Sequence, residues 1–314
     1  MTDRTLQMPP STMPRIDERS LVQKAKRSDG CFEIVGLAVL VVSIFVLLAL
    51  IFDFMADGLA RIDYNFLINF PSRHPGQAGI LSAWVGTTMV MVTTTFLAVP
   101  LGVAAGIYLE EYATKNLIND LIEINVTNLA GVPSIIYGLL ALGLFVQTLG
   151  LGEIVLVAGM TLALLILPII IVATREALRS IPLEIREAAY GLGADKWQAI
   201  RMYLLPAARP GILTGAIVGM SRAIGETAPL ITIGALTFIA FLPPTPIQLE
   251  FPFINFDWLF SPFTAMPIQM FNWISRPQAG FHINAAATGL ILLAMTLLMN
   301  GFAIWLRYRI RSKQ

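Results

Sequence analysis

Hydrophobic residues dominate six long stretches of the chain, and shorter polar segments separate them. Each stretch has at least the ~20 residues that a helix needs to cross a hydrocarbon core. The stretches cover residues 32–52, 80–108, 127–149, 153–174, 212–241 and 285–306. Since 56% of the 314 residues are hydrophobic and only 13% are charged, the chain is too apolar for a soluble domain of this length. The pattern predicts an all-α membrane protein with six transmembrane helices.

The N-terminal segment differs from the rest of the chain. Residues 1–31 are polar and contain three prolines, which predicts a disordered tail. A signal peptide is the alternative, but its apolar region would be only ~7–15 residues long. We therefore expect an uncleaved first transmembrane helix with an external loop at 32–79, and a transmembrane domain at 80–307. A polar loop at 175–211 interrupts that domain.

The positive charges are distributed unevenly between the two sides of this topology. Seventeen of the 21 Lys and Arg lie in the tail, in the 109–126 loop (Lys115), in the 175–211 loop or after Trp305. By the positive-inside rule these segments, and therefore both termini, are cytoplasmic. The aromatic-rich segment at 242–284 is then external. It is typical of an interfacial belt with a short surface helix, while a docking surface for an external partner is the alternative.

The composition excludes several kinds of catalytic site. One cysteine (Cys31) and two histidines (His74 and His282) do not predict a metal cluster. The chain has no phosphate-binding G-x-x-x-x-G-K-[ST] loop, so it has no nucleotide site of this type, and it lacks G-x-S-x-G and H-E-x-x-H. We expect a non-catalytic membrane subunit without a bound cofactor.

The polar loop contains ordered helix start and stop signals. Pro182 can occupy the first turn of a helix that runs to Tyr190 and ends at the following glycines. Asp195, with Gln198 three residues later, predicts the N-cap of a second helix. We expect Pro206 and the Pro210–Gly211 pair to close that second helix. We call this helix–glycine–helix unit, residues 182–206, the elbow; it has the form of a compact knob that fits a groove in a partner.

The elbow carries the sequence motif of ABC-importer permeases. The pattern E-A-A-x3-G-x9-I-x-L-P is matched with its full spacing, except that Tyr203 replaces the isoleucine. The matching residues are Glu187, Ala188, Ala189, Gly193, Leu205 and Pro206. In this family the elbow is the coupling helix, which sits in a cleft of a cytoplasmic ATPase. The resemblance implies the same role for residues 187–206, with ATP used by that partner subunit.

Four further segments resemble the PstA-type permeases of phosphate ABC importers. They are AVPLGVAAGIYLEEYA (98–113), NLAGVPSIIYGLLALG (128–143), SRAIGETAPLI (221–231) and SPFTAMPIQMFNWISRPQ (261–278). The resemblance implies the MetI-like permease fold of type I ABC importers. It also implies three kinds of partner: a second, PstC-like permease, a PstB-like ATPase dimer and an external, PstS-like phosphate-binding protein.

Two charges lie inside the fifth apolar stretch. Arg222 is about eleven residues into a helix that would enter the membrane at Gly211, and therefore ~16 Å deep. Glu226 follows one turn later, and Pro229 cannot donate to the carbonyl of Gly225, so we expect a bend beside the pair. Intramembrane charges usually face a transport path or the protein interior.

We expect Arg222 to exchange Glu226 for phosphate, because a guanidinium fork suits an oxyanion. Ser221 and Thr227 are candidate additional donors, and Arg175 is a weaker candidate for the path whose more ordinary role is at the membrane boundary. A structural ion pair between Arg222 and Glu226 is the alternative. At the level of the protein, the alternatives are an ABC permease for phosphonate or sulfate and a secondary anion transporter that uses Glu226 as a proton relay.

Overall fold

The computed structural model describes residues 18–114, 116–246, 253 and 255–311. Lys115, which we assigned to the cytoplasmic side, lies outside the described residues. The chain divides into two units, Met1–Asp53 and Phe54–Gln314. In the first unit the described residues belong to the long helix α1 (Glu18–Gly58). Its side chains from Phe32 to Leu50 are exposed over their whole circumference, as expected of a helix that faces lipid.

The helix α1 begins earlier than the sequence predicted. Residues 18–31, which we expected to be part of a disordered tail, form its first turns, whereas residues 1–17 lie outside the described part. The last proline of this region is Pro14. The following residues include Leu, Gln, Lys, Ala and Arg, which have good helix propensity, so the helix extends beyond the apolar stretch.

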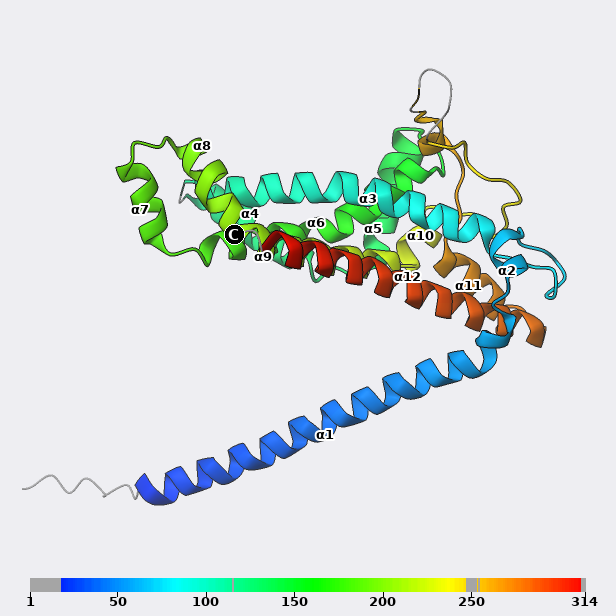
Figure 1. The fold of residues 1–314 in the computed structure, drawn as a ribbon, viewed down its shortest axis with the longest axis horizontal. Coiled ribbons are helices and arrows are strands. Elements are labelled where there is room, and N and C mark those ends of the chain that lie inside the picture. The colour runs from blue at the N-terminus through cyan, green and yellow to red at the C-terminus, as the bar shows by residue number, and fades with distance from the viewer. Residues whose placement is uncertain (1–17, 115, 247–252, 254, 312–314) are drawn as a thin grey trace, which may run out of the picture. The chain divides into compact units, whose positions relative to one another are not determined.

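All regular elements that the structure describes in the second unit are helices (Figure 1). The first half contains η1 (Leu59–Arg61), α2 (Tyr64–Ile68), α3 (Leu81–Ile107), η2 (Tyr108–Tyr112), α4 (Leu117–Leu129), α5 (Ser134–Ala141), η3 (Leu142–Thr148) and α6 (Val155–Arg179). The second half contains α7 (Leu183–Gly191), α8 (Lys196–Ala199), η4 (Ile200–Leu204), α9 (Leu205–Ile224), α10 (Ala228–Thr232), η5 (Asp257–Phe260), α11 (Met266–Ile274) and α12 (Ala279–Arg311). The elements η2, η3 and η4 are π-helical turns.

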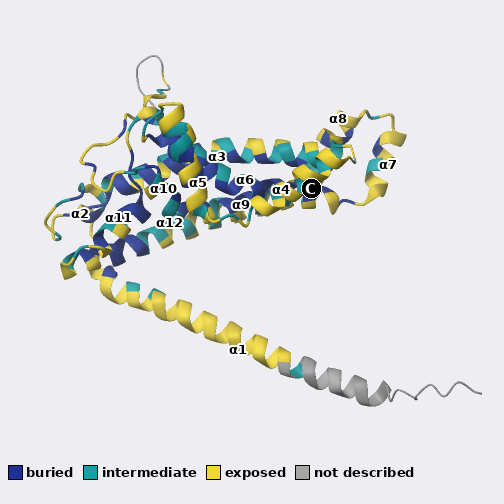
Figure 2. Cartoon of the chain, turned by 180° about the vertical axis from the view of Figure 1, so that it is seen from behind, coloured by how far each residue is buried: buried dark blue, intermediate teal, exposed yellow. Residues whose placement is uncertain are grey.

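Helix α6 is the centre of this unit, with α3 and α9 packed against it (Figures 1 and 2). Glycines make the close approach possible: a Cβ at Gly106 of α3 would lie 2.6 Å from Cβ of Thr174, and one at Gly102 would lie 2.7 Å from Ile170. On the other side Gly215 faces Ala173. Gly102 and Gly106 are four residues apart, a spacing of small residues that allows close helix contact, and here it marks the packing face of α3.

The number of straight spans differs from the six that we predicted. Within the described residues, four helices are long and apolar enough to cross a membrane: Phe32–Arg61, Leu81–Tyr112, Val155–Arg179 and Ala279–Arg309. The pair Leu117–Leu129 and Ser134–Thr148 is bent by 108° and counts as a fifth span if it is taken together. The stretch predicted at 212–241 is not one helix, because α9 ends at Ile224 and only the short α10 follows before Ile233.

The end of the elbow also differs from the prediction. Pro206 and Pro210 do not close the second elbow helix; α8, η4 and α9 continue one another from Lys196 to Ile224. Pro206 lies in the first turn of α9, where a missing N–H is tolerated. The π-turn η4 precedes Pro206 and departs from the regular α-helical hydrogen-bond pattern, so the helix continues through both prolines.

The segment predicted to form an interfacial aromatic belt is partly a core element. It does contain the expected short helix, α11, but Trp258, Phe263 and Trp273 are buried. Trp273 packs with its ring centroid 6.0 Å from that of Phe66. Other aromatics in the segment, such as Phe260 and Phe271, are exposed as a belt requires.

Candidate functional site

The elbow lies at one end of the helical unit, and α2 and α11 lie at the other (Figure 1). Its two helices begin as the sequence predicted, at Leu183 after Pro182 and at Lys196 after Asp195. Asp195 forms a complete capping box: its Oδ1 accepts from the amide of Gln198 at 2.7 Å, and the Gln198 side chain accepts from the amide of Asp195 at 3.0 Å. The second helix therefore starts at a fixed residue.

The turn between the elbow helices requires a glycine. Gly193 has a φ of +82°, a conformation that other residues rarely adopt. Its amide donates to the carbonyl of Tyr190 at 2.9 Å, and the next amide reaches Ala189 at 3.1 Å, which satisfies the last carbonyls of α7. The family motif thus specifies the backbone turn that separates the two helices.

The side chains of the elbow divide into an inner and an outer set. Ala189 is buried, as are Ile200 and Leu204, which pack on Leu178 and Ile181 at the end of α6. The outer set comprises large apolar side chains that are more than half exposed, namely Leu183 (60%), Leu192 (78%), Trp197 (55%) and Met202 (64%). Glu187 and Ala188 are also exposed. An anchored inner face and an apolar outer face suit a surface that another protein covers.

The second part of the candidate site is the break between α9 and α10. Helix α9 ends at Ile224, Gly225 is exposed, and Pro229 lies in the first turn of α10. The predicted bend is therefore a complete interruption of the helix. Nε of Arg222 lies 3.4 Å from Oε1 of Glu226, and their side chains are 38% and 19% exposed. This is a long contact between partly exposed groups, so it holds Arg222 weakly.

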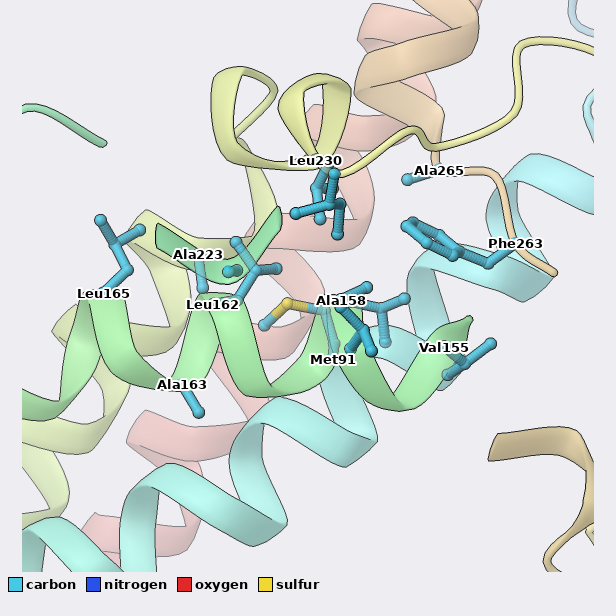
Figure 3. Close-up of a cluster of buried hydrophobic side chains, with 14 of the residues drawn as sticks. Met91, Val155, Ala158, Leu162, Ala163, Leu165, Ala223, Leu230, Phe263 and Ala265 are labelled. Carbon is cyan, nitrogen blue, oxygen red and sulfur yellow. The ribbon is translucent and has the colours of Figure 1, made fainter. Parts of the chain in front are cut away.

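The two ends of the break are fixed in the core. Ala223 on one side and Leu230 on the other lie beside Leu162 of α6 (Figure 3), and Ile224 belongs to the same buried cluster. Gly138 of α5 lets α10 approach closely, because a Cβ there would collide with Thr232 and Pro229. The break is consequently a built feature that turns Arg222, Gly225 and Glu226 outward from a rigid frame.

The structure places the two predicted additional donors differently. The Ser221 hydroxyl is engaged, since it lies 2.7 Å from the carbonyl of Ile217 and 2.5 Å from Oδ1 of Asn300 on α12. Thr227 is partly buried at the N-cap of α10, and its side chain does not cap that helix. Among the described residues, the terminal nitrogens of Arg222 make no hydrogen bond, so its fork is available.

An apolar groove near the break does not suit an anion. It has a volume of about 700 Å³ and lies between α3, α9 and α12. Its lining includes Met91, Phe96, Met220, Met299 and Phe302. A phosphate in such surroundings would lose its hydration without gaining donors. The polar surface at Arg222 is therefore the better candidate.

Arg175 belongs to a charge cluster that sequence reasoning missed. Its guanidinium is buried near the elbow end of α6, 2.7 Å from Oε1 of Glu123 and 3.5 Å from Oε2 of Glu110. Arg179 contacts the same Glu110 at 3.0 Å, and Arg186 of the elbow contacts Glu111 at 2.9 Å. The available signal was the adjacent pair Glu110–Glu111 at the end of an apolar stretch, where buried acids need partners.

The fold and this site define a membrane-embedded transport subunit: a helical unit with an exposed docking elbow and a broken helix that carries charge. The profile of the family described as "Binding-protein-dependent transport system inner membrane component" matches residues 98–312. The chain belongs to this family, which confirms the resemblance seen in the motif.

Relatives cover most of the chain. "Probable ABC transporter permease protein YqgI" of Bacillus subtilis (strain 168) is 28% identical over 273 residues, 85% of this chain and 91% of that protein. "Phosphate transport system permease protein PstA 1" of Mycobacterium tuberculosis (strain CDC 1551 / Oshkosh) is 33% identical over 221 residues, 70% of this chain and 68% of that protein. The PstA protein of Yersinia pestis is 29% identical over 85% of both chains.

A solved structure of the MetNI methionine ABC transporter in an inward-facing conformation has the same fold. The TM-score is 0.56 at 18% sequence identity, over 74% of this chain and 95% of the chain in that structure. The predicted MetI-like permease fold is therefore confirmed, although the count of six straight spans is not.

Proposed function

We propose that this chain is a permease subunit of an ATP-driven importer that moves inorganic phosphate across the inner membrane. The cargo is suggested by the relatives named as phosphate permeases. The observation that carries the proposal is the helix break, which presents the fork of Arg222 beside Gly225 and a weakly held Glu226. Phosphate is an oxyanion that can accept two parallel hydrogen bonds from one guanidinium.

In this proposal Glu226 keeps Arg222 neutralised until the anion arrives. A 3.4 Å contact between partly exposed groups contributes little free energy, so phosphate can replace the carboxylate at low cost. Thr227 is a further possible donor, while Ser221 would first have to release Asn300. Arg175 is held by two carboxylates, which favours its boundary role over a place in the path.

The elbow would receive movement from a cytoplasmic ATPase dimer. Its exposed apolar side chains and its anchored inner face support this role for Glu187, Ala188, Ala189, Gly193, Leu205 and Pro206. Helix α8 continues through η4 into α9 without a break. A displacement of the elbow would therefore move Arg222 through one continuous helical segment. We place the elbow and both chain termini in the cytoplasm, on the basis of the positive-inside distribution.

The remaining partners follow from the same scheme. A second, PstC-like permease would cover the exposed side of Arg222 and complete the path, and a PstS-like binding protein would deliver phosphate from outside. The chain itself would hydrolyse no ATP and bind no cofactor; the PstB-like ATPase would supply the energy.

The test is transport by the reconstituted complex of both permeases, ATPase and binding protein in vesicles. We expect ATP-dependent uptake of labelled phosphate that unlabelled sulfate and phosphonate do not compete, and background uptake with Arg222→Ala although the ATPase still copurifies. If sulfate or phosphonate competes with phosphate, the transported substrate is another oxyanion. Uptake without ATP but with a proton gradient would favour a secondary transporter. Normal uptake by Arg222→Ala would leave the structural ion pair as the role of this charge.

A further inference from the structure

The turn that follows α3 is wider than an α-helical turn. In η2 the amide of Ala113 donates to the carbonyl of Tyr108 at 2.8 Å, a bond that spans five residues. Such π-turns are uncommon and concentrate at functional positions. Here the turn follows α3 at the end of the helical unit that carries the elbow, and it contains Glu110, Glu111 and Tyr112 in sequence.

These three residues contact three different helices. Glu110 pairs with Arg179 of α6 at 3.0 Å, and with Arg175 as described above. Glu111 pairs with Arg186 of α7 at 2.9 Å. The ring of Tyr112 lies under Lys196 of α8, with Nζ 4.9 Å from the ring centroid. We call this set of contacts, made by residues 110–112, the clasp.

The clasp is buried where it joins the elbow. The side chain of Glu111 is only 8% exposed and that of Arg186 is 20% exposed. Arg186 also donates to the carbonyl of Leu178 at 2.9 Å, so one guanidinium joins α7 to α6 and to η2, the turn that continues α3. Ion pairs shielded from water in this way are much more sensitive to the loss of one partner than surface pairs are.

The elbow is attached to the bundle in several ways. The chain enters it from α6 and leaves it through η4 into α9, and its buried side chains pack in one cluster with residues at the ends of α3 and α6. The clasp adds ion pairs between η2 and both α6 and α7. Helices α3 and α9 also meet near the helix break, where Oγ1 of Thr95 lies 3.2 Å from Sδ of Met220, two residues before Arg222. If a movement of the elbow were transmitted to α9 and not to α3, α9 would slide against α3 at this contact.

We infer that the clasp is a second transmission route, which makes α3 move together with the elbow when the ATPase acts on it. Glu111 and Arg186 are its central positioning residues, because they form the direct link between α3 and α7. The inference rests on the proposed coupling function of the elbow, but not on the identity of the cargo.

The first experiment measures whether α3 and the elbow move as one body. In a Cys31→Ser chain assembled with its partner subunits, spin labels are attached through Tyr108→Cys in η2 and Glu184→Cys in α7, which are both exposed. We expect the distance distribution between the labels to stay unchanged on addition of ATP. In the complex that also carries Glu111→Gln, addition of ATP should broaden or shift the distance distribution between the labels. An unchanged distribution in the Glu111→Gln complex would overturn the inference, whatever the transported substrate is.

The second experiment measures phosphate uptake per ATP hydrolysed. Glu111→Gln and Arg186→Gln should each lower this ratio about two- to thirtyfold, the range expected for loss of one coupling contact, while ATP hydrolysis continues. The double variant Glu111→Arg with Arg186→Glu exchanges the two charges and should restore part of the uptake per ATP. Glu176→Gln is the matched control, because its 3.6 Å contact with Arg179 lies within α6 and joins no second helix.

A milder variant covers the case in which Glu111→Gln does not assemble. Tyr112→Leu keeps an apolar side chain but removes the ring under Lys196, and we expect it to lower uptake per ATP less than Glu111→Gln does. An unchanged ratio in assembled complexes of Tyr112→Leu and Arg186→Gln would refute the transmission route. If the unmodified complex hydrolyses ATP without moving phosphate, the proposed cargo is wrong, and the label distances still decide the role of the clasp.

Discussion

The role proposed for Arg222 depends on the shape of its guanidinium as well as on its charge. Lysine would preserve the charge but would offer a compact ammonium in place of two parallel donors. We expect Arg222→Lys to reduce phosphate uptake about 10- to 100-fold, the effect of losing one hydrogen bond to a charged group. Arg209→Lys, an exposed position near the start of the same helix, is the control. Full uptake by Arg222→Lys would show that charge alone is sufficient.

Ser221 allows a structural role to be separated from a transport role. Its hydroxyl lies between the Ile217 carbonyl and Asn300, so Ser221→Ala leaves the Asn300 oxygen without this donor. We expect a loss of about 1–3 kcal/mol of stability, measured as thermal unfolding in detergent, with normal uptake per folded complex. Ser275→Ala should change little, because among the described residues the Ser275 hydroxyl donates to the carbonyl of Phe271 in the preceding turn of helix. Reduced uptake at unchanged stability would instead assign Ser221 to the path.

At the scale of elements, the glycines of α3 decide how closely it can approach α6. A methyl group at Gly106 would lie 2.6 Å from Cβ of Thr174, so one of the two helices must shift. We expect Gly106→Ala to destabilise the protein by about 1–3 kcal/mol, the usual cost of overpacking. Gly301→Ala on α12, where nothing lies within 4 Å, is the matched control and should be neutral or stabilising. Equal unfolding temperatures for the two variants would contradict this packing.

The start of α8 depends on one side chain. Asp195→Ala removes the acceptor for the Gln198 amide, and we expect α8 to lose about 1 kcal/mol of local stability. Hydrogen exchange of the amides in residues 196–200 should become correspondingly faster. Asp195→Asn keeps an acceptor oxygen at this position and should exchange like the unmodified protein. Faster exchange in Asp195→Asn as well would point to a role for the charge instead of the cap.

At the scale of the whole molecule, the proposed orientation can be tested by chemical labelling. In a Cys31→Ser background, Met202→Cys on the elbow and Phe256→Cys near η5 provide single exposed thiols, at positions that are 64% and 62% exposed. We expect a membrane-impermeant maleimide to label residue 256 in intact cells and residue 202 only after lysis. The reverse pattern would place the elbow outside and would exclude its coupling to a cytoplasmic ATPase.

Much of the elbow could be predicted because its signals are local. The capping box at Asp195 and the glycine turn at Gly193 act over three or four residues, so the sequence specifies them directly. The ends of the long helices are less predictable. The stretch at 212–241 satisfied the length requirement, yet Gly225 and Pro229 ended α9, and the core contacts of Ile224 and Leu230 fixed the break.

By itself the sequence determined the membrane class, the helical character of the chain, the two helices of the elbow and the presence of Arg222 and Glu226 within an apolar stretch. These follow from apolar length, local capping and motif spacing, which are properties of neighbouring residues. Only the tertiary structure decided that the Arg222 side chain is partly exposed, with terminal nitrogens that no described residue contacts by a hydrogen bond, and that Arg175 is held by two carboxylates. It alone joined Glu111 to Arg186, because partners 75 residues apart are brought together by helix packing and leave no periodic signal in the chain.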